Sequence, residues 1–243
     1  MRLAFVSDVH GNLTALEAVV ADIRRRGVDR VVHGGDLALM GPRPAEVVDL
    51  LRELGCEGVV GNTDELLWRP EEHERQRARA PRLAPLLRLL FEVYAPDTRE
   101  RLGSERVEWL RGLPGELGLE LMTVVHAAPG DLWRAPMPDA TDRELTSTYT
   151  VLGSSRVAYG HIHRPFVRQL DGLTVANAGS VGLPWDGDPR ASYLVVDGPA
   201  VETIRVEYDI DREVKALRSA GHPDAERLAE MRRTGRFIPP PAS

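Results

Sequence analysis

Five short motifs in this chain carry side chains of the kind that bind metal ions. They are Asp8-Val9-His10, Gly35-Asp36, Gly61-Asn62, His126 and Gly160-His161-Ile162-His163. Their carboxylate oxygens, imidazole nitrogens and amide oxygen are ligands that suit divalent transition metals. Two such ions held close together can activate a water molecule and bind a phosphate group. The motifs therefore predict a two-metal site that hydrolyses phosphate esters.

The elements that must position these motifs alternate between strand and helix in the first third of the chain. The apolar pattern predicts strands at residues 2–6, 30–33 and 57–60 and helices at residues 14–26 and 44–54. Thr14 is the expected N-cap of the first helix. This βαβαβ order favours a mainly parallel sheet covered by helices. The polar residues of the first three motifs follow its strands, so they should share the edge at which such sheets bind ligands.

Strand character returns after residue 117. We expect strands at residues 121–125, 156–159, 166–170, 173–176, 191–196 and 201–207, then helices at residues 211–220 and 224–234. Asp171-Gly172 is a turn of the type that joins antiparallel strands directly, so a second sheet of mixed or antiparallel pairing should form. No repeat or low-complexity linker divides the chain, and residues 1–243 should form one α/β domain.

Residues 65–113, between the two strand-rich regions, are predicted to be mostly helical. Arginines recur among the glutamates of this segment, at Arg75, Arg77, Arg79, Arg82 and Arg88. One interpretation is a solvated helical cap of mixed charge. The other is a lid over the site whose arginines reach the substrate phosphate. The sequence leaves both interpretations open.

Composition argues against several classes of function. Of the 243 residues 42% are hydrophobic and 28% charged, and the net charge is −6 with a pI near 5.7. This acidic balance disfavours strong binding to nucleic acid or to anionic membranes. No apolar run is long enough to cross a bilayer. The single cysteine, Cys56, fits a reducing compartment, so we expect a cytoplasmic protein in which Cys56 is a buried small hydrophobe.

In their order and spacing the five motifs resemble those of the calcineurin-like metallophosphoesterase superfamily. Further segments resemble the small prokaryotic phosphodiesterase branch of that superfamily, namely Gly41-Pro42-Arg43-Pro44, residues 177–182, residues 186–193 and Tyr208-Asp209. Only residues 65–113 match weakly. The resemblance implies the family fold, a four-layer αββα sandwich in which two mixed sheets are flanked by helices.

The resemblance also implies which ion each ligand binds. One ion would be held by Asp8, His10, Asp36 and His163, and the second by Asp36, as the bridging carboxylate, with Asn62, His126 and His161. A hydroxide between the ions would be the nucleophile that attacks phosphorus in line. The ions would be divalent transition metals, with Mn first and with Fe, Ni, Zn or Co also accepting these ligands.

Other residues are expected to act on the substrate. The expected catalytic set is Asp36, Asn62, Thr63 and Asp64, and the expected phosphate contacts are Asn12, Asn62 and Asn177. Most members of the family have a histidine, credited with protonating or stabilising the leaving oxygen, where this chain has Thr63. Threonine donates a hydrogen bond but is no acid near neutral pH, so activated diesters should be preferred over unactivated monoesters. Asp64 is expected either to support the site or to cap the next helix.

Three interpretations of the function follow. The leading one is a metal-dependent phosphodiesterase acting on a small phosphate ester. Related folds also support a dinucleoside polyphosphate hydrolase or a phosphoprotein phosphatase, and a third interpretation is a non-catalytic metal-binding scaffold module. All seven metal positions keep competent side chains, which favours catalysis. Neither the substrate nor the oligomeric state, a homodimer included, follows from the sequence.

Overall fold

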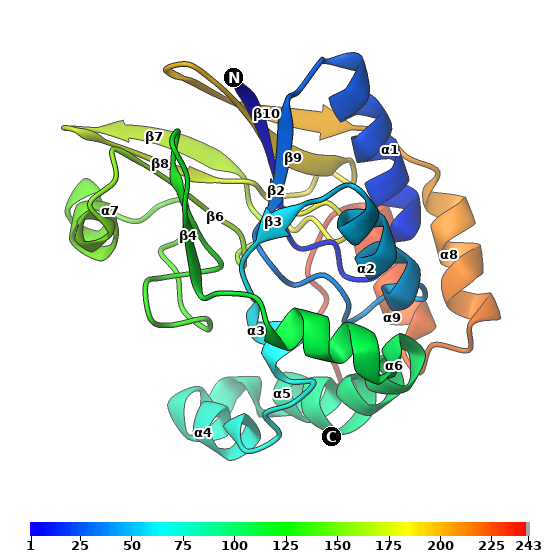
Figure 1. Cartoon of the computed structure of the whole chain (residues 1–243). Coiled ribbons are helices and arrows are strands. Elements are labelled where there is room, and N and C mark those ends of the chain that lie inside the picture. The colour runs from blue at the N-terminus through cyan, green and yellow to red at the C-terminus, as the bar shows by residue number, and fades with distance from the viewer. Residues whose placement is uncertain (242–243) are drawn as a thin grey trace.

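The computed structural model describes residues 1–241 and contains two five-stranded sheets with helices on their outer faces (Figure 1). The first sheet has the order β10-β9-β1-β2-β3 and the second β4-β5-β6-β8-β7. The strands of the first sheet are β1 (Arg2–Val6), β2 (Arg30–His33), β3 (Glu57–Gly58), β9 (Ala191–Asp197) and β10 (Ala200–Val206). Those of the second are β4 (Glu116–Gly118), β5 (Thr123–Val125), β6 (Arg156–Tyr159), β7 (Phe166–Leu170) and β8 (Leu173–Asn177).

The first sheet has a parallel centre, in which β1 pairs with β2 and β2 with β3. The helices α1 (Leu13–Arg25) and α2 (Pro44–Glu53) connect these strands, so the predicted βαβαβ unit is confirmed. On the other edge, β9 and β10 add in antiparallel pairing. Along β1 the side chains alternate: Leu3 and Phe5 belong to the core between the sheets, and the next residue after each belongs to the core under the helices.

The second sheet is mixed, as expected. Its three central strands, β5, β6 and β8, are parallel, and β4 and β7 pair antiparallel at the edges. The Asp171-Gly172 turn joins β7 to β8, and Gly172 has a φ of 70°, a conformation that glycine adopts without strain. On the outer face of this sheet lie α7 (Asp142–Tyr149) and η3 (Thr150–Leu152), and Leu145 and Tyr149 of α7 are buried against it.

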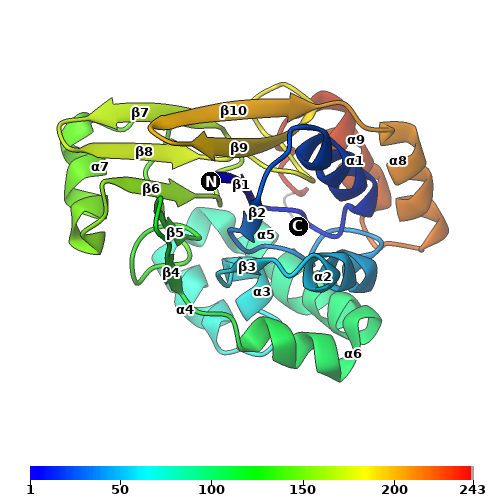
Figure 2. The same ribbon diagram turned by 45° about the horizontal axis from the view of Figure 1, so that its top comes forward.

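Three buried apolar clusters separate four layers. The largest lies between the first sheet and a helical layer that includes α1, α2, α8 (Ile210–Ser219) and α9 (Ala225–Thr234). The second lies between the sheets, with Phe5 and Leu194 from one and Val124 and Ala176 from the other. The third lies under α7. Figure 2 shows the edge strands β7 and β10 next to each other, and the expected αββα sandwich is confirmed.

Residues 65–113 form the predicted helical segment, here called the insert. After the short α3 (Asn62–Glu65) it comprises α4 (Glu72–Arg79), η1 (Pro81–Leu83), α5 (Ala84–Arg88), the π-helical η2 (Leu89–Tyr94) and α6 (Ala95–Arg111). The helix α6 packs against α2, and Leu87, Leu90 and Phe91 join the largest core cluster. Figure 1 shows α4 and α5 away from the sheets, on the side of α3 and α6.

The start of the first helix differs from the prediction. The N-cap of α1 is Asn12, whose Oδ1 accepts a hydrogen bond from the amide of Ala15 at 3.0 Å. Thr14 lies inside the helix, and its hydroxyl donates to Glu213 of α8 at 2.8 Å. The prediction of Thr14 as the N-cap was therefore wrong. Asparagine and threonine both cap helices well, but the hydroxyl of Thr14 is hydrogen-bonded to Glu213, which lies 199 residues further along the chain.

The helix α7, the edge strand β4 and the short helices α3 and η3 were not predicted. The strand expected at residues 121–125 is also shorter, because β5 begins at Thr123. An edge strand of three residues carries too little alternation to stand out in a sequence, and its pairing with β5 defines it.

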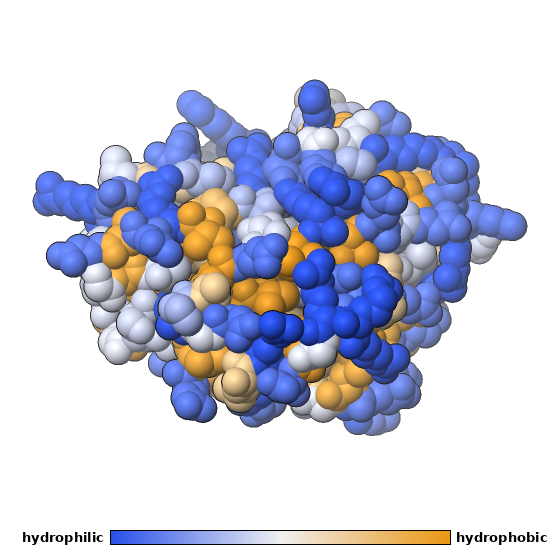
Figure 3. Space-filling model, turned by 90° about the horizontal axis from the view of Figure 1, so that it is seen from above, coloured by the Kyte–Doolittle hydropathy of each residue, from blue (hydrophilic) through white to orange (hydrophobic). Residues whose placement is uncertain are grey.

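The surface seen from above is mostly hydrophilic, with hydrophobic residues gathered in patches near its middle (Figure 3). Among the residues that the structure describes, none belongs to a helix both long and apolar enough to span a bilayer. Cys56 is buried and free, and burial raises the pKa of its thiol to about 12, which agrees with its expected role as a small hydrophobe.

A buried ion pair ties three helices of the outer layer together. Arg43, the N-cap residue of α2, donates through its guanidinium to Glu213 of α8 and to Thr14 of α1. The Glu213 side chain is fully buried, whereas that of Arg43 is 19% exposed. A buried carboxylate without its cation is costly, so this pair holds α8 against the helices that carry the site loops.

We predict that Arg43→Ala lowers the free energy of unfolding by about 3 kcal/mol, because it leaves the carboxylate of Glu213 buried and unpaired. Arg25→Ala is the control, since Arg25 pairs with Asp22 at the surface and should change stability by less than about 0.5 kcal/mol. Urea unfolding followed by circular dichroism measures both. The double variant Arg43→Ala/Glu213→Leu should recover part of the loss. Equal losses in the two single variants would contradict the prediction.

Candidate metal centre

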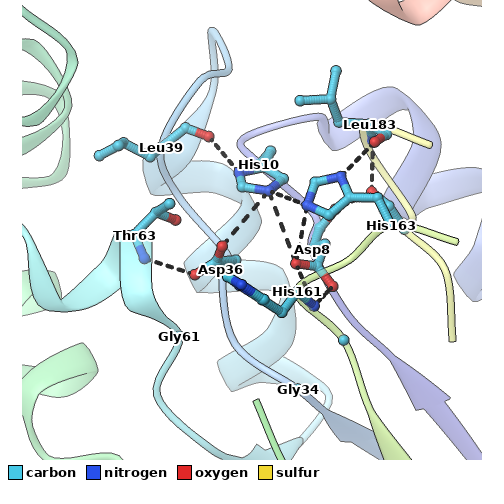
Figure 4. Close-up of polar contacts among 12 residues, drawn as sticks. Asp8, His10, Gly34, Asp36, Leu39, Gly61, Thr63, His161, His163 and Leu183 are labelled. Atoms are coloured by element: carbon cyan, nitrogen blue, oxygen red, sulfur yellow. Dashed lines mark hydrogen bonds and ion pairs between the residues drawn. The ribbon is translucent and has the colours of Figure 1, made fainter. Parts of the chain in front are cut away.

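Seven side chains from loops that follow strands converge on one site. They are the predicted ligands Asp8, His10, Asp36, Asn62, His126, His161 and His163. The first four follow β1, β2 and β3, and the last three follow β5 and β6. Figure 4 shows Asp8, His10, Asp36 and His163 pointing toward one another. The carboxyl ends of the parallel strands of both sheets meet here, as expected for a ligand site.

One half of the site is formed by Asp8, His10 and His163. The Nε2 atom of His163 lies 3.2 Å from His10 Nε2 and 3.2 Å from Asp8 Oδ1. Oδ2 of Asp36 lies 3.8 Å from His10 Nε2. One ligand atom from each of Asp8, His10 and His163 lies within 4.8 Å of the other two, a spacing that a single ion can fill.

The other half is formed by Asn62, His126 and His161. Oδ1 of Asn62 lies 2.8 Å from His126 Nε2 and 2.9 Å from His161 Nδ1. Oδ1 of Asp36 lies 3.6 Å from His126 Nε2. The two carboxylate oxygens of Asp36 therefore face different halves, which is the position of a bridging ligand.

The outer ring nitrogen of each histidine faces a backbone carbonyl. The pairs are His10 with Leu39 (3.1 Å), His126 with Gly34 (2.7 Å), His161 with Trp133 (3.2 Å) and His163 with Leu183 (2.5 Å). A carbonyl can only accept, so each outer nitrogen carries the proton of its ring. In a neutral ring the inner nitrogen then carries a lone pair, and carbonyls in this position orient the histidines of metal sites.

The consequence is that acceptors face acceptors in both halves. The lone pairs of His10 and His163 point at each other, and the amide oxygen of Asn62 meets the lone pairs of His126 and His161. In neutral rings no proton relieves this repulsion; on His126, whose pKa is raised by Asp36 and Asp8 against the effect of burial, a second ring proton would do so by donating to Asn62. Two cations would relieve it, and the hard and borderline donors present fit divalent transition metals.

Local backbone strain accompanies the ligands. Five of them have positive φ, between 49° and 65°: Asp8, His10, Asp36, His161 and His163. This region is costly for residues other than glycine, and such residues cluster at functional sites. Arg232 of α9, which is fully buried, donates to the carbonyl of Met40 at 2.9 Å and to that of His10 at 3.5 Å, so it holds the strained loop in place.

The glycines that precede two of the motifs leave room for carboxylates. A Cβ atom at Gly61 would meet Oδ1 of Asp36, and one at Gly160 would meet Oδ2 of Asp8. Both contacts would be far closer than side chains tolerate. These glycines therefore allow the loops of different strands to approach the ligands, which gives the motif glycines a steric reason.

The environment of this buried centre shifts the pKa values of its two carboxylates in opposite directions. Burial, and then the neighbouring His163, lower the pKa of His10 well below its usual value. Burial, and then His126, lower the pKa of His161 to about 3. Both rings are therefore neutral. Burial, with a contribution from Asp8, raises the pKa of Asp36, whereas His163 and the other neighbouring histidines lower that of Asp8 against the effect of burial. A positive charge beside Asp36 would therefore favour its ionised form.

Asp64 supports the loop of the bridging ligand. Its carboxylate accepts hydrogen bonds from the amides of Asp36 (2.8 Å), Leu37 (3.0 Å) and Gly61 (3.1 Å). It lies at the third position of α3 and forms a capping box with Gly61. Of the two expectations for Asp64, supporting the site agrees with these contacts. It does not line the cavity described below, so a direct catalytic contact is not supported.

Asn12 and Asn177 are engaged elsewhere, and we correct their assignment as phosphate contacts. Both are fully buried. The amide nitrogen of Asn12 donates to Gly182 and Tyr208, and its oxygen caps α1. The amide of Asn177 donates to the Gly160 carbonyl at 2.6 Å and accepts from Gly179. These contacts hold the site loops, and neither residue lines the cavity over the candidate ligands.

A cavity of about 490 Å³ opens over the ligands His10, Asp36, Asn62, His161 and His163. The insert lines one part of it, through residues that include Gln76, Arg79, Leu83 and Leu87. Thr63 also lines it, and its buried hydroxyl has no hydrogen-bond partner within residues 1–241. The amide of Thr63 donates to Oδ1 of Asp36 at 2.8 Å. This hydroxyl is therefore free to bind a substrate oxygen.

The arginines of the insert are placed unequally. Arg79 lines the cavity but pairs with Asp131 at 2.5 Å. Arg75 is absent from the lining; it is mostly exposed and pairs with Glu72 of its own helix. The exposed Arg164, next to the ligand His163, lines the cavity and was not among the predicted site residues. Its position directly after the Gly-His-x-His motif was the only signal.

Two tryptophans were also missed. Trp185 stacks on the ring of His163 with centroids 3.7 Å apart, and the carbonyl of Trp133 accepts from His161. Both line the cavity, and the buried Nε1 of each lacks a partner among the described residues. An indole N–H can only donate. No spacing in the sequence links these two residues to the ligand motifs.

Comparison with known proteins identifies the family. A model of the calcineurin-like phosphoesterase superfamily domain matches residues 1–199. The chain belongs to the calcineurin-like phosphoesterase superfamily. The metal dependence of this family agrees with the ligand groups described above.

Several members of the superfamily are similar over most of their length. The chain is 30% identical to the uncharacterized protein MJ0912 of Methanocaldococcus jannaschii over 242 residues, covering 88% of this chain and 91% of that one. It is 27% identical to the phosphodiesterase YfcE of Escherichia coli over 215 residues, covering 84% and 91%. A crystal structure of a metallophosphoesterase from Sphaerobacter thermophilus superimposes with a TM-score of 0.77 at 29% identity, covering 97% and 99%.

We predict that Asp36→Asn lowers the metal content of the reconstituted protein from about two ions per chain to one or fewer, because an amide cannot balance two cations. Asp211→Asn is the control, since that side chain is 87% exposed on α8 and should leave metal content unchanged. Elemental analysis after dialysis measures both. An unaltered metal content in Asp36→Asn would contradict the assignment of Asp36 as the bridging ligand.

Proposed function

We propose that this phosphoesterase is a phosphodiesterase with two divalent metal ions, Mn first among the candidates. The observation that carries the proposal is the pair of acceptor clusters at His10 with His163 and at Asn62 with His126 and His161, on the two sides of Asp36. Similarity to YfcE, named as a phosphodiesterase, supports the diester. When bound, two such ions supply a hydroxide for in-line attack on phosphorus and neutralise the charge that develops there.

The residues of the chain have separate tasks around the phosphate. Asp36 faces both halves and sets the spacing of the ligands. The hydroxyl of Thr63 and the indole N–H groups of Trp133 and Trp185 offer unpaired donors to phosphate oxygens. Arg164 places a guanidinium at the same cavity and adds charge-assisted hydrogen bonds.

Thr63 makes a diester with a good leaving group the better substrate. Its hydroxyl can stabilise a departing oxygen by a hydrogen bond but cannot protonate it near neutral pH. The insert would act as a lid, since residues of α4, η1, α5 and η2 line the cavity over the candidate ligands. We retain the expectation of a cytoplasmic location from the single reduced cysteine.

Two alternatives have weaker support. A dinucleoside polyphosphate hydrolase or phosphoprotein phosphatase would use the same ligands, but the cavity lining offers no distinct feature that favours either. A non-catalytic scaffold would have no need for a cavity beside a complete ligand set or for unpaired donors inside it. The proposed function fails if protein reconstituted with Mn, Fe, Ni, Zn or Co hydrolyses neither activated diesters nor monoesters.

We predict that the rate on aryl phosphodiesters falls steeply as the pKa of the leaving phenol rises, and that Thr63→His flattens this dependence. A positioned acid contributes about 10²–10⁴-fold, so the variant should gain at least about tenfold on poor leaving groups. Initial rates on a series of substituted phenyl diesters measure the slope. Thr63→Ser, which keeps the hydroxyl, is the control. A flat dependence in the unmodified protein would show that another group already acts as the acid.

We predict that Arg164→Ala raises KM for phosphodiesters about tenfold with metal content unchanged, because one charge-assisted contact to phosphate is lost. Arg75→Ala is the matched control, since its guanidinium is mostly exposed and paired with Glu72. Steady-state kinetics with elemental analysis separate the two effects. If KM rises equally in both variants, general electrostatics and not a phosphate contact is responsible.

A further inference from the structure

The cavity over the metal centre is apolar along the insert. Leu83, Leu86, Leu87 and Leu90, from η1, α5 and η2, line it. Other parts of the chain add Met40, Met137, Ile162, Met231 and Phe237. A charged phosphate needs none of these side chains. They indicate that the part of the substrate attached to the phosphate is apolar.

The mouth of this cavity carries apolar side chains in contact with solvent. Within residues 1–241 five large hydrophobic side chains are exposed, and two of them, Leu83 (46%) and Met137 (40%), line the cavity. One comes from the insert and the other from the loop that precedes α7. Exposed apolar side chains that meet at one opening mark a place where an apolar ligand is bound.

Three of the polar side chains that line the cavity are already engaged. Arg79 pairs with Asp131, and the amide of Gln76 donates to Glu72. Arg227 donates to Asp224, to Tyr94 and to the carbonyl of Ile238. These side chains have their partners inside the protein, so they are not set up to recognise the edge of a nucleobase or the hydroxyls of a sugar.

Of the residues that line the cavity, Thr63, Trp133 and Trp185 have buried side-chain donors that lack a partner among the described residues. The ring of Trp185 stacks on His163. The backbone carbonyl of Trp133 accepts from His161, and the backbone amide of Thr63 donates to the carboxylate of Asp36. Phosphate oxygens, which only accept, suit these three donors. The ring of Trp133 is stacked with that of Phe91, with an angle of 7° between the ring planes and 6.0 Å between the centroids. One face of the Trp185 ring is covered by His163. Aromatic stacking surface is thus partly used, and the free apolar wall is made of leucine and methionine.

We infer that the substrate is an amphiphilic phosphoester with an aliphatic chain, whose phosphate lies at the metal ligands and whose chain lies along the leucines of η1, α5 and η2. This rests on the proposed function for the reaction, but the binding preference belongs to the cavity itself. Burying a methylene group is worth up to about a fourfold gain in affinity, so several methylenes against this wall would dominate selectivity.

Binding tests the inference without hydrolysis. The probes are methyl-, butyl- and octylphosphonate, which resist phosphatase cleavage, with phenylphosphonate and adenosine monophosphate as competitors of other chemistry. Quenching of tryptophan fluorescence in Mn-loaded protein reports Kd, because Trp133 and Trp185 line the cavity. We expect Kd to fall at least about tenfold from methyl to octyl. A flat series, or adenosine monophosphate binding more tightly than octylphosphonate, overturns the inference.

Variants of cavity residues test where the aliphatic chain of the substrate binds. Leu83→Gln/Met137→Gln changes two exposed cavity residues, so folding should be kept, and it should remove most of the chain-length dependence of Kd. Val151→Gln is the matched control, because Val151 is 75% exposed and does not line the cavity. An unaltered dependence in the double variant overturns the assignment of the wall.

Kinetics connect the inference to the reaction. For p-nitrophenyl methyl, butyl and octyl phosphate the leaving group is the same, so any rise of kcat/KM with chain length reports apolar binding. We expect a rise that parallels the phosphonate series. Failure to hydrolyse even the methyl ester would contradict the proposed function, while the phosphonate series would still decide whether the cavity prefers an aliphatic chain.

Discussion

With neutral histidine rings, hydrogen-bond acceptors face one another inside this protein, and the rest of the site depends on that arrangement. Backbone carbonyls hold the protons of four histidines on the outside of the site, which turns the lone pairs inward. Two carboxylates and one amide oxygen complete the set. Facing acceptors that are buried from water are costly, and bound cations would offset this cost.

The fold supplies the conditions for this concentration of acceptors. Strands from both sheets end at one place, so loops far apart in the sequence present their ligands together. Five ligands have left-handed backbone conformations, and buried groups such as Asp64 and Arg232 bind the loops that carry them. The rigid core of two sheets and outer helices thus holds strain that a free loop would release.

The residues that line the cavity beside this centre differ from the family pattern at Thr63. A hydroxyl at Thr63 stands where the family pattern has an imidazole, and our proposal that activated leaving groups are preferred rests on this difference. The insert covers the ligands with leucines, and its arginines are either paired or directed away. The strand ends thus carry the candidate metal ligands, whereas the insert, the two tryptophans and the loop before α7 line the cavity beside them.

The sequence by itself determined the family and the two-sheet fold, and it predicted the seven residues that meet at the candidate metal centre, because glycine-flanked polar residues directly after apolar strands are a local pattern. Only the tertiary structure decided what depends on partners far along the chain. Asn12 and not Thr14 is the N-cap of α1, because the hydroxyl of Thr14 donates to Glu213. Asn177, expected to contact phosphate, instead donates to the carbonyl of Gly160. The apolar wall over the metal centre also needed the structure, because leucines at helical spacing have the same pattern whether they face a core or a cavity.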